Sequence, residues 1–128
     1  MGLFYMNFLR IFIAIALCLP VVVKANVISF IPGDSVESHV EKDEYKHYKI
    51  SALAGQTVTG VLDQLSADAD LYVRIGSKPT LKKYDCRPYR GDTRVEKCFL
   101  KLDKDSDIYI LVHGHEASNY RLKVDVSN

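Results

Sequence analysis

The sequence has 128 residues, of which 48% are hydrophobic and 26% are charged, and its formal net charge at pH 7 is +1. A near-neutral chain with mixed charges lacks the basic balance that marks proteins binding nucleic acid or anionic membranes, so neither partner is expected. About 100 residues remain after the apolar leader, which is enough for one small domain with one core.

The first 25 residues are typical of a secretory signal peptide. A short lead ends at Arg10, an apolar run extends from Ile11 to Val23, and Ala25 supplies a small residue at the expected cleavage site. The apolar run is shorter than the roughly 20 residues of a membrane-spanning helix, which argues against a retained anchor. We therefore expect cleavage near Ala25, a secreted or periplasmic product of residues 26–128, and no membrane span in the mature form.

Residues 26–128 alternate between apolar and polar side chains in short runs, and polar turns interrupt these runs roughly every 8 to 12 residues. The first run ends at the turn Pro32-Gly33-Asp34, and no convincing helical pattern follows. The expected strands are Val27–Ile31, Val36–Val40, Tyr45–Ser51, Thr57–Asp63, Asp68–Gly76, Val95–Leu102, Asp107–His113 and Tyr120–Val126.

Each expected strand has one apolar face. Leu71, Val73 and Ile75 point to one side of their run, whereas Asp70, Tyr72 and Arg74 point to the other. A single sheet cannot bury so many one-sided strands, but two packed sheets can. The sequence therefore predicts an all-β fold, namely an antiparallel β-sandwich of about eight strands with a jelly-roll-like topology.

Two cysteines remain once the leader, which carries Cys18, is removed. Cys86 and Cys98 are an even count in an exported chain, which indicates one disulfide. Closing a loop of about 13 residues stabilises a fold by roughly 3 kcal/mol in the chain-entropy model.

A series of segments, in order, resembles a known family. They read GDSVESHV, EYKHYKI, LAGQTVTGVL, LSADADLYVRIGSKPT and YDCRP, then a second cysteine, DIYILVHG and NYRLKV. Together they resemble the bacterial pre-peptidase C-terminal domain, a β-sandwich module found after the catalytic domain of secreted peptidases. The resemblance extends from about Gly33 to Val126.

The resemblance implies a non-catalytic module with a role in secretion, folding or surface attachment. Related collagen-binding domains of bacterial collagenases bind calcium and present aromatic residues on one sheet face. Here the signal peptide directly precedes the domain, so a role in cis to a peptidase is not expected.

Two groups of residues are candidate metal ligands. Asp68 and Asp70 stand at a strand entrance and offer oxygens to calcium, with Asp63 as a third carboxylate; alternatively, they cap backbone amides in a turn. His113 and His115 share a face if their strand continues, and would need a third ligand to hold zinc for a small metal-dependent enzyme. The alternative is two exposed loop histidines.

Tyrosines with neighbouring cations form the candidate binding surface. Tyr72 and Tyr109 lie on strand faces opposite their apolar neighbours, and Tyr84, Arg87 and Tyr89 lie in an irregular segment. Tyrosine rings beside guanidinium groups can stack on sugars or peptides and form hydrogen bonds at the rim. The alternative is that these tyrosines only cover the sandwich.

No catalytic constellation is evident, because no G-x-S-x-G motif occurs, no carboxylate pair stands out and paired cysteines are poor nucleophiles. We therefore expect a monomeric, non-enzymatic module without a cofactor, unless calcium binds, that binds an extracellular peptide, polysaccharide or envelope surface. The alternative is a chaperone or inhibitor acting in trans on a secreted peptidase.

Overall fold

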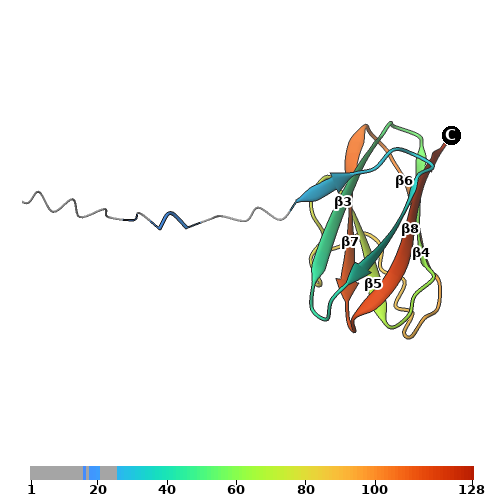
Figure 1. Ribbon diagram of the computed structural model, residues 1–128. Helices are drawn as coiled ribbons and strands as arrows, with labels where there is room; N and C mark the ends of the chain where they lie inside the picture. Colours follow the sequence, from blue (N-terminus) through green and yellow to red (C-terminus); the bar gives the residue numbers. More distant parts are fainter. Residues whose placement is uncertain (1–15, 17, 21–25) are drawn as a thin grey trace, which may run out of the picture.

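The computed structural model describes residues 16, 18–20 and 26–128. Most of the predicted signal peptide lies outside the described residues, so cleavage near Ala25 stays a prediction. The described chain contains eight strands arranged in two sheets of four, and it contains no helix (Figure 1). Within these residues, no helix is long and apolar enough to cross a membrane.

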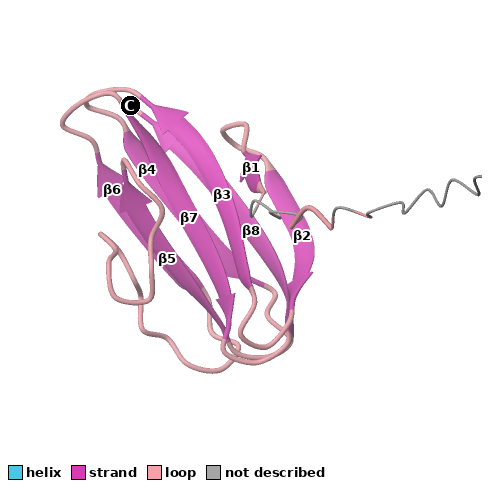
Figure 2. Cartoon of the chain, turned by 90° about the vertical axis from the view of Figure 1, so that its left-hand side faces the viewer, coloured by secondary structure: helices cyan, strands magenta, loops and turns pink. Residues whose placement is uncertain are grey.

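The two sheets pack face to face, with connecting loops at both ends of the domain (Figure 2). One sheet has the order β1-β3-β7-β5 and the other the order β2-β8-β4-β6, which confirms the predicted all-β sandwich. The strands are β1 (Val27–Ser29), β2 (Ser35–Val40), β3 (Tyr45–Ala52), β4 (Thr57–Asp63), β5 (Ala69–Ile75), β6 (Glu96–Lys101), β7 (Ser106–Gly114) and β8 (Ser118–Ser127).

Consecutive strands alternate between the sheets from β1 to β8, as in a jelly roll, because each connection carries the chain across the sandwich. One pair departs from the predicted antiparallel arrangement. β1 lies parallel to β3, with Val27 opposite His47 and Ser29 opposite Lys49. The reason is topological: the chain reverses once on entering β2 in the other sheet and again on returning to β3, so β3 regains the direction of β1.

The core consists of the inward faces predicted from the alternation. Ile108, Ile110 and Val112 of β7 have no exposed surface, and Leu71 of β5 is also fully buried. Burying such a side chain stabilises the fold by roughly 1.5–3 kcal/mol. These faces therefore account for most of the driving force that holds the two sheets together.

The connection between β5 and β6, residues 76–95, is here called the β5–β6 crossover. It joins the edge strands of opposite sheets and therefore covers one open side of the sandwich. Its backbone takes left-handed conformations at Gly76, Tyr89 and Asp92. The predicted disulfide between Cys86 and Cys98 is confirmed, with 5.9 Å between the two Cα atoms, and it fastens the crossover to β6.

Candidate functional site

The candidate site is built where the β5–β6 crossover folds over the outer face of β5. Val73 and Cys86 pair through two backbone hydrogen bonds, with N···O distances of 2.9 and 3.0 Å. The side chain of Asp85 accepts a further hydrogen bond from the backbone N–H of Ile75 at 2.7 Å. These contacts hold the crossover against the sheet edge in one position.

Tyr72 lies beneath this crossover. Its side chain is 2% exposed, so the expectation that it is an exposed binding residue is wrong. The alternation along β5 did place it on the outer face, but Tyr84 and Arg87 of the crossover pack against its ring there. Burial raises the pKa of the Tyr72 hydroxyl to about 12, so the side chain is neutral at physiological pH. Its ring packs beneath Tyr84 and Arg87.

Tyr72, Tyr84, Arg87 and Tyr89 form one group, here called the tyrosine–arginine cluster. The guanidinium carbon of Arg87 lies 4.9 Å from the ring centre of Tyr72 and 4.0 Å from that of Tyr89. Tyr84 meets Tyr72 and Tyr89 edge to face, at 5.6 and 6.3 Å between ring centres, and its hydroxyl shares a hydrogen bond with that of Tyr89. Such cation–π contacts contribute roughly 0.5–2 kcal/mol each and fix the plane of the guanidinium.

The cluster exposes a chemically mixed surface. Tyr89 is 65% exposed, whereas Tyr84 and Arg87 are half-buried. The Nε atom of Arg87 has no hydrogen-bond partner among the described residues. The structure therefore brings together four of the five residues predicted as a binding surface; Tyr84, Arg87 and Tyr89 reach the surface, and Tyr72 lies below them.

Tyr109, the fifth predicted residue, lies outside this cluster. It is half-buried on the outer face of β7, and the strand register sets it between Lys49 of β3 and Arg74 of β5. The guanidinium of Arg74 donates a hydrogen bond to the backbone oxygen of Lys78 at 3.3 Å, which links this row to the start of the crossover. Tyr109 thus occupies the sheet surface next to the cluster.

The predicted calcium ligands lie at the entrance of β5. Asp70 is 8% exposed, and Asp68 is half-buried with one side-chain oxygen that lacks a hydrogen-bond partner. Burial, together with the charge of Asp70, raises the pKa of the Asp68 carboxyl. Among the described residues, no three His, Cys, Asp or Glu side chains converge on a point that could hold a metal ion. Calcium at Asp68 and Asp70 stays a prediction.

The two histidines are not brought together. His113 is buried at the end of β7, with its Nδ1 atom 3.8 Å from a carboxylate oxygen of Asp70 and its ring 4.8 Å from that of Tyr45. His115 is exposed in the turn after β7, because the strand ends at Gly114. The shared face that a zinc site needs therefore does not form.

Glu96 is a buried acid that sequence reasoning did not single out. It is 1% exposed at the start of β6, and one of its carboxylate oxygens accepts a hydrogen bond from the backbone N–H of Leu71 at 2.6 Å. Its other oxygen has no partner among the described residues. Burial raises the pKa of the Glu96 carboxyl to about 7. The sequence feature that could have predicted this burial is the position of Glu96 on the inward face of its strand, which it shares with Cys98.

Comparisons with known proteins concern the family and the fold of the domain. The family model described as the bacterial pre-peptidase C-terminal domain matches residues 44–125. Alkaline serine exoprotease A of Vibrio alginolyticus is 36% identical over 74 residues, which are 58% of this chain but 13% of that protein. The chain therefore spans about an eighth of the length of that curated relative.

Two crystal structures share the fold. Aeromonas hydrophila PliG, a periplasmic lysozyme inhibitor of g-type lysozyme, aligns with a TM-score of 0.65 and 19% identity, over 79% of this chain and 96% of that one. The pre-peptidase C-terminal domain of collagenase from Bacillus anthracis aligns with a TM-score of 0.59 and 11% identity, over 80% of this chain and 97% of that one. At these identities the likeness establishes the sandwich architecture.

Proposed function

The chain belongs to the bacterial pre-peptidase C-terminal domain family, and from this membership we propose that it is a non-catalytic module that binds a partner outside the cytoplasm. Domains of this family are non-catalytic parts of secreted peptidases. The disulfide fits an oxidising compartment such as the periplasm or the cell exterior. The binding surface is the β5–β6 crossover, with the tyrosine–arginine cluster at its centre and Tyr109 at its margin.

One observation carries this proposal: a half-exposed guanidinium is held between tyrosine rings on a segment that the disulfide fastens in place. Rings and guanidinium groups are the side chains that contribute most to binding per residue, because they offer large rigid contact areas with hydrogen-bonding ends. A pre-ordered surface also loses little conformational entropy when a partner binds. The partner is a peptide, a polysaccharide or an envelope component.

The experiment is a pull-down from secreted and envelope fractions of the host, with and without calcium. Tyr89→Ala is the test variant, because Tyr89 is the most exposed member of the cluster and its ring covers Arg87. We expect capture to fall about tenfold or more, as for a residue near an interface centre. Ile31→Ala is the control, since Ile31 is 68% exposed beside β1, at the opposite edge of the sheet from β5.

Equal capture by the wild type and Tyr89→Ala would place the binding surface elsewhere on the domain. Loss of capture in both variants would point to general surface hydrophobicity instead of a site. A dependence on calcium would direct attention to Asp68 and Asp70.

The second candidate function is an inhibitor or chaperone that acts in trans on a secreted hydrolase. It is supported by the similarity in fold to PliG, a lysozyme inhibitor, of which 96% aligns with this chain. A sandwich of this size can therefore act on a hydrolase without a catalytic domain of its own.

The test is an activity assay on the peptidases secreted by the host and on a g-type lysozyme, with the purified protein added in molar excess. Inhibition or protection of one enzyme, lost in Tyr89→Ala, would favour this candidate. Unchanged rates for every enzyme, with no co-purifying peptidase, would remove it.

A further inference from the structure

Positive charge is concentrated in one part of the domain. Residues 78–97 contain seven Lys or Arg residues and three acidic residues, whereas the rest of residues 26–128 contains eight basic and thirteen acidic residues. One of the three acids in this segment, Glu96, is 1% exposed. The near-neutral total charge therefore hides a strongly basic surface segment. The seven basic residues are Lys78, Lys82, Lys83, Arg87, Arg90, Arg94 and Lys97.

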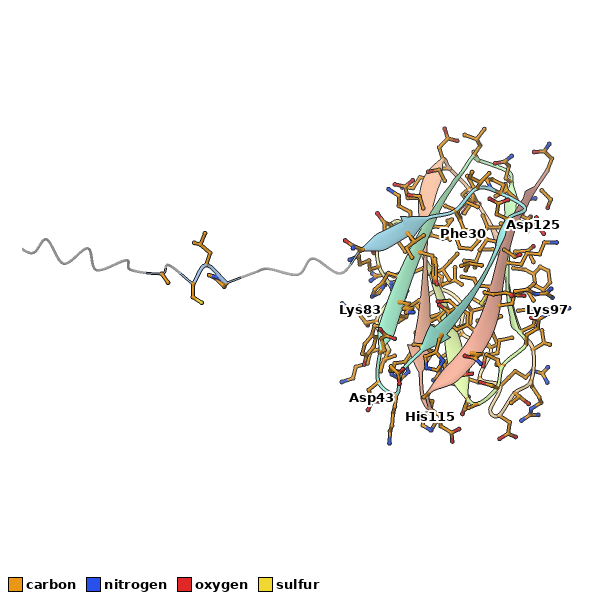
Figure 3. The ribbon with its side chains drawn as sticks, in the orientation of Figure 1. Phe30, Asp43, Lys83, Lys97, His115 and Asp125 are labelled. Carbon is orange, nitrogen blue, oxygen red and sulfur yellow. A yellow bond between two sulfur atoms is a disulfide. The ribbon has the colours of Figure 1, made fainter. Side chains whose placement is uncertain are left out.

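Part of this segment encloses a hollow of about 570 Å³ at the junction of the crossover and β6. Three cations line it, together with two apolar residues; this set, here called the cationic hollow, is Pro88, Arg90, Arg94, Val95 and Lys97. In the view of Figure 3, Lys83 of the crossover and Lys97 of β6 lie on opposite sides of the domain.

The cations of the cationic hollow form no ion pairs among the described residues. Among the ion pairs of the described residues, none includes Arg90, Arg94 or Lys97. Arg94 donates only one long hydrogen bond, at 3.4 Å, to the backbone oxygen of Gly91. By contrast, Arg121 of β8 is held by Asp63 through two bonds of 2.8 and 2.6 Å. Grouped cations without counter-ions attract anionic ligands.

Arg87 adjoins the hollow through Pro88 and is already oriented. Tyr72 and Tyr89 hold its guanidinium on two sides, and no ion pair of the described residues involves it. A planar guanidinium fork matches carboxylate and sulfate oxygens in pairs, which lysine cannot do. The surface thus combines the cations of the hollow with one guanidinium group, that of Arg87, whose orientation is fixed.

Exposed ring faces accompany these cations. Tyr89 is 65% exposed, and Phe99 is 64% exposed on the same face of β6 as Lys97, two residues away. The centre of a protein–protein interface is depleted in lysine and relies on apolar anchors that are fully removed from water. Only Val95 and Pro88 supply apolar lining in the hollow. Rings that can stack on sugars, set among cations, fit a charged carbohydrate better than a protein.

We propose that the cationic hollow and Arg87 bind an acidic polysaccharide, whose carboxylate or sulfate groups contact the cations while its sugar rings lie on Tyr89 and Phe99. This inference rests on the proposed function, because it names the partner class of the crossover surface. Carboxylated and sulfated polysaccharides share the required chemistry, because both are sugar polymers with regularly spaced anionic groups.

The experiment is calorimetric titration of the purified protein with polygalacturonate, which carries carboxylates, with dextran sulfate, and with neutral dextran. We expect both acidic polymers to bind and neutral dextran not to bind. The triple variant R90Q/R94Q/K97Q should bind about tenfold or more weakly, because it removes all three cations that line the hollow. The control K42Q/K104Q/K123Q removes the same charge from turns and a strand outside the crossover and should bind within about twofold of wild type.

Arg87→Lys keeps the charge but loses the planar guanidinium, so it should weaken binding several-fold although the net charge is unchanged. Equal weakening by both triple variants would mean attraction by net charge alone and would overturn the inference. Tighter binding of a single-stranded oligonucleotide or of an acidic protein would also overturn it. Equal binding of neutral dextran, lost in Tyr89→Ala, would overturn it while leaving the proposed function in place.

Discussion

The strand pair β3–β7 and the β5–β6 crossover are held in place by different physical means. In β3–β7, eight consecutive residue pairs follow one register, and the inward members, such as Ile50 opposite Ile108, have almost no exposed surface. The crossover has no regular strand, and it is fastened by one disulfide, a short backbone pairing with β5 and the stacked rings around Arg87.

The difference suggests separate roles: the strand pair stabilises the fold, whereas the crossover is suited to binding. The strand pair gains its free energy from many equivalent apolar contacts, so it tolerates little change in volume. The crossover depends on a few specific contacts and presents its remaining side chains to solvent. A segment of that kind can change its exposed residues without unfolding the domain, which is why binding functions concentrate on loops held by a rigid scaffold.

Ile110→Ala should have the largest effect on stability. Ile110 of β7 has no exposed surface, and truncating it leaves a cavity between the sheets. We expect a loss of about 2–5 kcal/mol in the free energy of unfolding, measured by urea denaturation. Tyr89→Ala removes contacts at the exposed surface of the crossover and should lower the same quantity by only about 0.5–1 kcal/mol. Equal losses in both variants would show that the crossover is part of the core.

Removing the disulfide tests how the crossover is fastened. The double variant C86S/C98S should lose roughly 2–5 kcal/mol of unfolding free energy. The wild type should likewise melt at a lower temperature under reducing conditions. Amide exchange should rise first in residues 76–95, whereas β3 and β7 remain protected. An unchanged melting temperature under reducing conditions would contradict a stabilising role for this bond.

Glu96 lies where the crossover ends and β6 begins, and its effect on stability depends on pH. Its pKa is raised to about 7 in the folded state from an ordinary value near 4.5, so the folded protein binds this proton more tightly than the unfolded chain. Below about pH 4.5 the buried Glu96 carboxyl does not lower the free energy of unfolding. As the pH rises toward 7, that free energy falls by up to about 3 kcal/mol.

E96Q removes that titration while keeping an oxygen that can accept the hydrogen bond from the Leu71 N–H. We expect the variant to be more stable than wild type at pH 8 and similar to it at pH 4, as measured by thermal melting across this range. A wild-type stability that rises from pH 5 to pH 8 by the same amount as that of E96Q would contradict the assignment.

The sequence by itself determined the strands and their inward faces. A period of two is visible in Leu71, Val73 and Ile75, and in Ile108 and Ile110, because one side of each strand must be apolar to pack on the opposite sheet. The disulfide was equally predictable, since the two cysteines outside the predicted leader allow only one intramolecular pairing. The family resemblance also rested on the residues alone.

Only the tertiary structure decided what covers the outer faces. Alternation says which side of a strand a residue occupies, but it does not say that Tyr72 lies under the crossover or that Glu96 is buried at the start of β6. The direction of β1 also depends on how distant segments meet. The physical reason is that a local pattern records each residue's immediate backbone geometry, whereas burial and strand direction arise from contacts between segments far apart in the chain.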